Sequence, residues 1–354
     1  MYNISRQSIT QERSFAHISG MKTSLLENAT AADRYATTFT WQNPGSFVQT
    51  AYRINMYSRR DSQKLIYQSD WIVSTNQTAV TVDGLRAKII DNQLYYWTVD
   101  VKYSNGECLS SSRTPFVTAV GDDWASKRLA WAGGAAGLFR TTVNTDLSRV
   151  EKAMLTVTAK DTSVARRNVY NIYINGKEIG IGPNQSFGNN LFYNTYDITN
   201  NLNEGSNIIG TYAYSQSKSA GILMQLTYFY KDGSSKVVYN SGRDTDLTQA
   251  LRVDAIVYGD SGQSIGTSYY EDLAQNADLT QWPYGWQNID DYINNAWKQP
   301  YYLNIPVNMT LRPAITGNMS RRTVEAQTIT QNSDGSWTID FGHEIEGGYS
   351  ARNY

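Results

Sequence analysis

The fold is decided by residues 171–180, NIYINGKEIG, and by residues 192–212, FYNTYDITNNLNEGSNIIGTY. Both stretches are rich in Ile, Tyr and Thr, which suit a pleated and half-buried strand. The Asn-Gly pair in the first stretch favours the tight turn of a two-residue β-hairpin. In the second stretch, Asp197 and Thr199 can hydrogen-bond their own backbone where a strand enters a loop. The two stretches therefore predict antiparallel strands of a β-sandwich.

Similar strand-like runs lie on both sides of these stretches. Upstream, QTAYRINMY (49–57) and LYYWTVDVKY (94–103) are short β-rich runs punctuated by turn residues, as in a sandwich of about one hundred residues. Downstream, GILMQLTYFYKDGSSKVVYN (221–240) continues the antiparallel pattern of a jelly roll. We therefore predict an all-β chain, with a fibronectin/Ig-like β-sandwich, a jelly-roll β-sandwich and the start of a third β-domain. The predicted boundaries are 1–37 for a polar N-terminal segment, 38–121 for the first sandwich, 122–300 for the jelly roll and 301–354 for an incomplete β-domain.

Composition narrows the classes of function. The 354 residues are 40% hydrophobic and carry 31 basic and 32 acidic side chains, mixed throughout the chain. No basic stripe is present to hold a phosphate backbone, so we expect no nucleic-acid partner. No signal peptide or apolar run of membrane-spanning length is visible, so we expect no membrane partner and a cytoplasmic location. The single cysteine, Cys108, excludes an internal disulfide.

The order of these phrases resembles the N-terminal region of bacterial α-L-rhamnosidases, inverting glycoside hydrolases with an (α/α)6-barrel catalytic domain. In that family a strand ending in NGK is followed by a YDvT loop, and IDFGHEIEGGY (339–349) is similar to the opening strand of the next β-domain. Inverting hydrolysis needs two carboxyl groups about 6.5–9.5 Å apart, and the family carries them on the barrel. The resemblance thus implies a chain truncated before its catalytic domain, with no catalytic residue and no activity alone.

The resemblance also implies that the jelly roll binds carbohydrate, since some relatives use this domain as a calcium-assisted rhamnose-binding module. Sugar binding needs an aromatic face for the ring and fixed polar groups for the hydroxyls, and QWPYGW (281–286) offers such a face. Aromatic loops of this kind more often serve as a plug at a domain interface, and that interpretation stands beside the sugar-binding one. Calcium prefers oxygen ligands near loop ends. The candidate sugar-binding residues are Trp282, Tyr284, Trp286, Asn175 and Asn184, and the candidate calcium ligands are Asp197 and Asp260.

These observations support three functions. The first is the non-catalytic N-terminal part of a rhamnosidase-like enzyme. In this role the chain is structural and could bind a rhamnose-containing glycoside or polysaccharide. The second is a subunit completed by a separate catalytic chain, and the third is a protein-interaction or adhesin module. Near the end of the chain, Trp337, Ile339 and Phe341 share one face of a predicted strand, which could fold back onto the jelly roll or form a homodimer. The neighbouring pair His343 and Glu344 is interpreted as structural.

Overall fold

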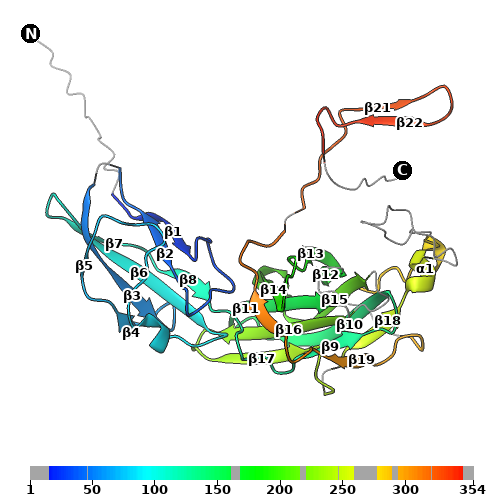
Figure 1. Cartoon of the computed structure of the whole chain (residues 1–354), viewed down its shortest axis with the longest axis horizontal. Coiled ribbons are helices and arrows are strands. Elements are labelled where there is room, and N and C mark those ends of the chain that lie inside the picture. The colour runs from blue at the N-terminus through cyan, green and yellow to red at the C-terminus, as the bar shows by residue number, and fades with distance from the viewer. Residues whose placement is uncertain are drawn as a thin grey trace, which may run out of the picture. The chain divides into compact units, whose positions relative to one another are not determined.

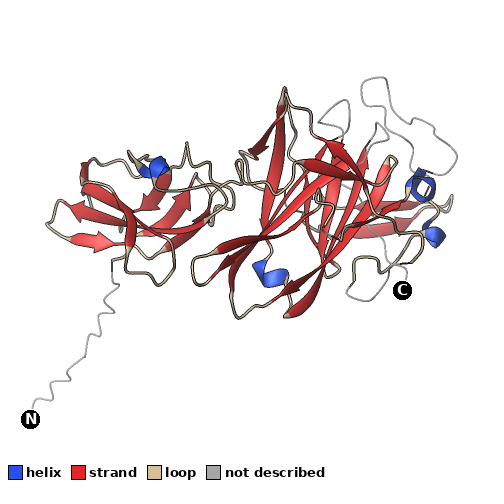
Figure 2. Cartoon of the chain, turned by 90° about the horizontal axis from the view of Figure 1, so that it is seen from below, coloured by secondary structure: helices blue, strands red, loops and turns tan. Residues whose placement is uncertain are grey.

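The computed structural model describes residues 16–45, 47–160, 168–215, 221–245, 247–258, 277–288, 294–319 and 321–345. They divide into two compact units, Met1–Met319 and Ser320–Tyr354. Strands dominate the described residues (Figure 2), and the predicted all-β class is confirmed. Among the described residues, the only α-helix is α1 (Asp254–Tyr258), and no helix there is long and apolar enough to cross a membrane.

The first sandwich packs a two-stranded sheet against a six-stranded one (Figure 1). β1 pairs with β2, and the larger sheet runs β4-β3-β6-β7, with β5 on β3 and β8 on β6. Alternate residues of β3 and β6 point inward, so that Ile54 and Trp97 are fully buried with Phe39 of β2. The strands are β1 (Ser19–Thr23), β2 (Phe39–Gln42), β3 (Gln49–Tyr57), β4 (Leu65–Gln68), β5 (Ile72–Val73), β6 (Leu94–Tyr103), β7 (Cys108–Ser110) and β8 (Thr114–Val117).

This sandwich begins earlier than the sequence predicts. β1 lies within the range 1–37, which we expected to precede the domain, and it pairs with β2. Ile18, Ala29 and Ala32 from the same range are buried in the sandwich core. The segment looked polar because its few apolar side chains are widely spaced, yet they are the ones that cover the core.

The second sandwich consists of a five-stranded sheet, β13-β12-β15-β10-β18, and a seven-stranded sheet, β19-β9-β16-β11-β14-β20, with β17 on β16. The predicted hairpin is confirmed, because β12 and β13 pair antiparallel across the turn at Asn175 and Gly176. Both turn residues have positive φ, 52° and 83°, which explains why Asn and Gly stand there. The strands are β9 (Arg128–Trp131), β10 (Ala136–Thr145), β11 (Val150–Lys160), β12 (Asn168–Ile174), β13 (Lys177–Gly182), β14 (Asn190–Asp197), β15 (Gly205–Ser215), β16 (Gly221–Tyr230), β17 (Ser235–Asn240), β18 (Gln249–Arg252), β19 (Tyr301–Asn304) and β20 (Thr310–Pro313).

Two strands from the range 301–354 belong to the second sandwich rather than to a third domain. β19 pairs antiparallel with β9, and β20 pairs parallel with β14. The range that we assigned to an incomplete β-domain is therefore divided. Its last part is a hairpin of β21 (Thr328–Gln331) and β22 (Trp337–Asp340) in the second unit. Trp337 and Ile339 of β22 are 60% and 43% exposed, and His343 and Glu344 are also exposed.

Candidate functional site

The predicted aromatic loop lies on the outer face of the five-stranded sheet. Side chains of β10, β12 and β15 alternate between the core and this outer face, and Tyr173, Tyr212 and Tyr214 point outward. A second apolar cluster forms there with Trp282, Trp286, Trp297 and residues near α1. The loop thus rests on a layer of aromatic rings supplied by the sheet.

Trp286 is the anchor of this loop. Its side chain is 1% exposed, and its ring lies edge-on to Tyr173 with 5.6 Å between the centroids. Gly210 of β15 leaves the space that the indole fills, since a Cβ there would lie 2.8 Å from the ring. Arg140 Nη1 donates a hydrogen bond of 2.6 Å to the Trp286 carbonyl oxygen. Trp286 therefore serves as a plug, and no face of its ring is available for a sugar, contrary to its predicted role.

Tyr284 and Trp282 are the exposed part of the same loop. The Tyr284 side chain is 64% exposed, whereas Trp282 is half-buried and edge-on to Tyr212, with the centroids 5.7 Å apart. Backbone hydrogen bonds from Tyr284 N to Trp282 O and from Trp286 N to Pro283 O close the turn. The loop is therefore fixed at its base and presents a tyrosine ring to solvent.

The two candidate asparagines lie at opposite ends of β13 and do not form one site. Asn175 Nδ2 donates to the Asn207 side chain at 2.8 Å, and Asn175 Oδ1 accepts from Ile208 N, so this side chain holds the hairpin turn. The neighbouring Gly176 lies against the Asn288 side chain, which places the turn beside the end of the aromatic loop. At the other end, Asn184 exchanges hydrogen bonds with Asn194. Both asparagines are committed to the fold.

The predicted calcium site is only partly described. Asp197 ends β14 and forms an ion pair of 2.6 Å with Lys152, and its other oxygen accepts from Thr199. Asp260 lies outside the described residues. Within the described ranges, no group of three His, Cys, Asp or Glu side chains could hold a metal ion. Asp197 is thus neutralised by a lysine rather than kept free for a cation.

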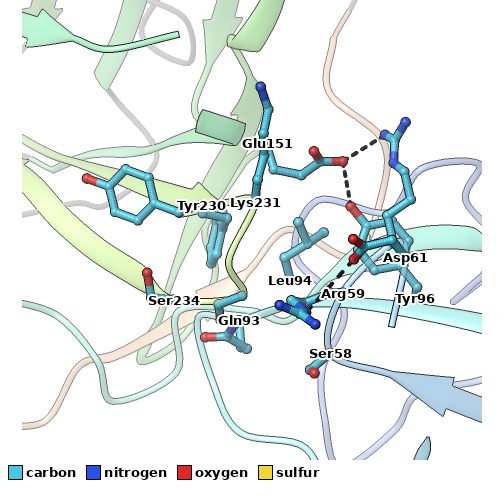
Figure 3. Close-up of a pocket in the computed structure, with 13 residues that line it drawn as sticks. Ser58, Arg59, Asp61, Gln93, Leu94, Tyr96, Glu151, Tyr230, Lys231 and Ser234 are labelled. Carbon is cyan, nitrogen blue, oxygen red and sulfur yellow. Dashed lines mark hydrogen bonds and ion pairs between the residues drawn. The ribbon is translucent and has the colours of Figure 1, made fainter. Parts of the chain in front are cut away.

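A pocket that sequence patterns did not indicate lies where the two sandwiches meet (Figure 3). Its volume is about 210 Å³, and loops of both sandwiches contribute to it. We call it the seam pocket. A small apolar cluster of Leu94, Tyr96 and Val117 from the first sandwich with Met154 and Phe229 from the second packs at this junction. The lining residues are Ser58, Arg59, Arg60, Asp61, Gln93, Leu94, Tyr96, Glu151, Phe229, Tyr230, Lys231, Gly233 and Ser234.

Polar contacts across the seam pocket tie the sandwiches together. Glu151 Oε1 accepts from both the Tyr96 hydroxyl and Arg60 Nη2, each at 2.8 Å, as the dashed lines in Figure 3 show. Burial, followed by the hydrogen bond to Glu151, raises the pKa of Tyr96 well above its usual range, so its hydroxyl stays a donor. Gln93 Nε2 donates to the Gly233 carbonyl oxygen at 3.2 Å. The pocket walls are therefore held in place by the domain junction itself.

Comparisons with known proteins agree with this architecture. Residues 18–121 match the family model for the N-terminal immunoglobulin domain of Rha78A-like proteins. An α-L-rhamnosidase of Formosa agariphila is 23% identical over 357 residues, which cover 84% of this chain and 35% of that protein. The solved structure of an α-L-rhamnosidase from Dictyoglumus thermophilum superposes with a TM-score of 0.67 at 17% identity, covering 92% of this chain and 38% of that one.

A second solved structure, an α-L-rhamnosidase from Aspergillus terreus, superposes with a TM-score of 0.63 at 18% identity, again covering 92% of this chain and 38% of that one. At these identities the structural matches show a shared fold. The chain spans little more than a third of the length of the relatives that it matches. The resemblance drawn from the sequence motifs is confirmed.

Proposed function

We propose that this chain, which corresponds to N-terminal domains of an α-L-rhamnosidase-like glycoside hydrolase, binds a rhamnose-containing glycoside without cleaving it. The relatives that it matches are named for hydrolysis of α-L-rhamnosides. A domain that holds such a substrate raises its concentration near a catalytic site on the same or another chain.

The observation that carries this proposal is the exposed Tyr284 ring on a loop with a buried anchor. The flat face of an aromatic ring can cover the apolar C–H side of a sugar. Because Trp286 and the Arg140 hydrogen bond fix the base of the loop, little freedom of the backbone is lost when a sugar binds. The half-buried Trp282 ring, which packs against Tyr212, belongs to the same turn as Tyr284.

Isothermal titration of the chain with methyl α-L-rhamnoside tests the proposal. We expect a dissociation constant on the order of 10⁻⁴ to 10⁻³ M, about −4 to −5.5 kcal/mol. Tyr284→Ala removes the exposed ring and should abolish the heat of binding while the melting temperature stays unchanged. Tyr35→Ala is the matched control, since Tyr35 lies in the first sandwich and is 65% exposed. This variant should bind methyl α-L-rhamnoside as the wild type does.

The same titration with a calcium chelator tests the predicted metal dependence. Because Lys152 already neutralises Asp197, we expect the chelator to leave the dissociation constant unchanged. A flat titration for the wild-type chain, with or without calcium, contradicts the binding proposal.

A further inference from the structure

The seam pocket carries more positive than negative charge. Arg59, Arg60 and Lys231 line it against only two carboxylates, Asp61 and Glu151. Glu151 neutralises Arg60 at 2.8 Å. Arg59 lies 3.9 Å from Asp61, and both side chains are exposed to water, so this pair contributes little. Arg59 therefore makes no close ion pair with Asp61, and its guanidinium can turn toward an anionic ligand.

Lys231 adds a charge that no carboxylate lining the pocket compensates. Its Nζ donates to the carbonyl oxygens of Ser148 at 2.7 Å and Leu147 at 3.5 Å. Carbonyl oxygens fix the position of an ammonium group without cancelling its charge. Two further arginines lie close by: Arg149 is 5.1 Å from the centroid of the Tyr230 ring, and Arg113 Nη1 donates to the Arg60 carbonyl oxygen. Asp232, next to Lys231 in the chain, is an acidic group close to these cations. Hydrogen bonds from Ser234 hold its pKa below the usual range, and the charges of Arg149 and Arg59 act in the same direction.

The walls of the seam pocket combine this charge with apolar and hydroxyl surface. Leu94 and Tyr230 supply apolar surface, and Ser58 and Ser234 supply hydroxyl groups (Figure 3). The volume of about 210 Å³ is below the roughly 300–1,000 Å³ of sites for drug-sized ligands. It suits a single ring of monosaccharide size. An apolar wall for one side of a ring, with polar and cationic groups around it, is the chemistry that a hydroxylated ring bearing a carboxylate requires.

We propose that the seam pocket binds a monosaccharide-sized sugar acid, such as a uronic acid residue. The site shares no residue with the aromatic loop at Trp282–Trp286, so it does not depend on the function proposed above. Its walls come from both sandwiches and are already joined by the contacts of Glu151 and Gln93. The ligand therefore meets a preformed site rather than one that it must assemble.

Isothermal titration of the whole chain at low ionic strength, with sodium D-glucuronate, D-glucose and inorganic phosphate as probes, tests this site. We expect glucuronate to bind at least about ten-fold more tightly than glucose, because only the acid engages the excess positive charge. It should also bind at least about ten-fold more tightly than phosphate, which cannot use the apolar wall. Added salt should weaken the binding of glucuronate.

Two variants locate the binding. Arg59→Gln removes one charge while keeping most of the alkyl stem that lies against Gly233, and we expect glucuronate binding to weaken at least about five-fold. Ser234→Trp fills the pocket and should abolish it. Lys64→Gln removes the same charge from an exposed lysine outside the pocket and should leave binding unchanged. Melting temperatures of all variants establish that they are folded.

Three outcomes overturn the inference. They are no binding of glucuronate, phosphate binding as tight as that of glucuronate, and glucuronate binding that Ser234→Trp leaves intact. The Tyr284→Ala variant separates the two proposals, since it should lose binding of methyl α-L-rhamnoside and keep that of glucuronate.

Discussion

Asp100 shows how a charged residue is held on the outer face of the first sandwich. It lies on β6 opposite Arg53 of β3, and its side chain is only 12% exposed. Burial alone would raise the pKa of Asp100, but hydrogen bonds from Ser110, Asn55 and Arg53 outweigh burial and hold the pKa below its usual range. The ionised carboxylate therefore stabilises the folded sheet.

The Asp100 carboxylate should contribute to the free energy of unfolding. We expect Asp100→Asn to lower it by about 1–3 kcal/mol at pH 7, because the hydrogen bonds to a charged acceptor become weaker. Since the pKa of Asp100 is lower in the folded state, its contribution is complete above the unfolded-state pKa of about 4 and is lost as pH falls through the folded-state value. The difference between wild type and variant should then shrink below about pH 4.

Urea denaturation at pH 7 and pH 3 measures this difference. Asp83→Asn, at an exposed position of the same sandwich, is the control and should change the free energy by less than about 0.5 kcal/mol. A difference for Asp100→Asn that is the same at both pH values contradicts the role assigned to the carboxylate.

At the scale of elements, β19 and β20 complete the seven-stranded sheet from a distant part of the chain. Leu303 of β19 and Leu311 of β20 pack against a cluster that includes Trp124 and Tyr193. Beyond β20, the Asn318 side chain accepts a hydrogen bond from Asn194, which is fully buried. These contacts make residues 301–319 part of the second sandwich.

Two shortened chains should therefore differ in stability. A chain that ends at Met319 keeps every one of these contacts, so we expect its melting temperature to match that of the full chain. A chain that ends at Pro300 exposes the edges of β9 and β14 and loses two leucines from the cluster, which should cost at least about 2 kcal/mol. Equal melting temperatures for the two shortened chains, measured by circular dichroism, contradict the assignment of β19 and β20.

The hairpin of β21 and β22 presents apolar side chains at its surface. Ile329, Trp337 and Ile339 are all exposed, and exposed apolar side chains on an edge strand favour pairing with another strand. We expect the full chain to form a homodimer through this hairpin and Trp337→Ser to shift it toward the monomer. Light scattering coupled to size-exclusion chromatography gives both masses. A monomeric wild-type chain at a concentration of about 100 μM means that the hairpin does not pair with a second copy.

At the scale of the whole molecule, local sequence patterns predicted the turns and strands, because these depend on residues that are neighbours in the sequence. The hairpin at Asn175 follows from its turn chemistry, and the two sandwiches follow from strand periodicity. Which strand completes a distant sheet edge depends on tertiary contacts, so the placement of β19 and β20 was not predicted. The burial of Trp286 depends on the space above Gly210. The seam pocket depends on loops that are distant in the sequence. Neither feature produces a periodic pattern in the sequence from which it could be predicted.

The central proposal is that this chain binds a rhamnoside without cleaving it, and hydrolysis of an aryl α-L-rhamnoside tests most directly whether cleavage is absent. Inverting hydrolysis needs an acid and a base held about 6.5–9.5 Å apart across the scissile bond, and we assign no residue of this chain to either role. The measurement is the release of the aryl alcohol by the purified chain of 354 residues, followed by absorbance over several hours. We predict a rate equal to that of the buffer blank. Turnover that follows the protein through successive purification steps would contradict the account.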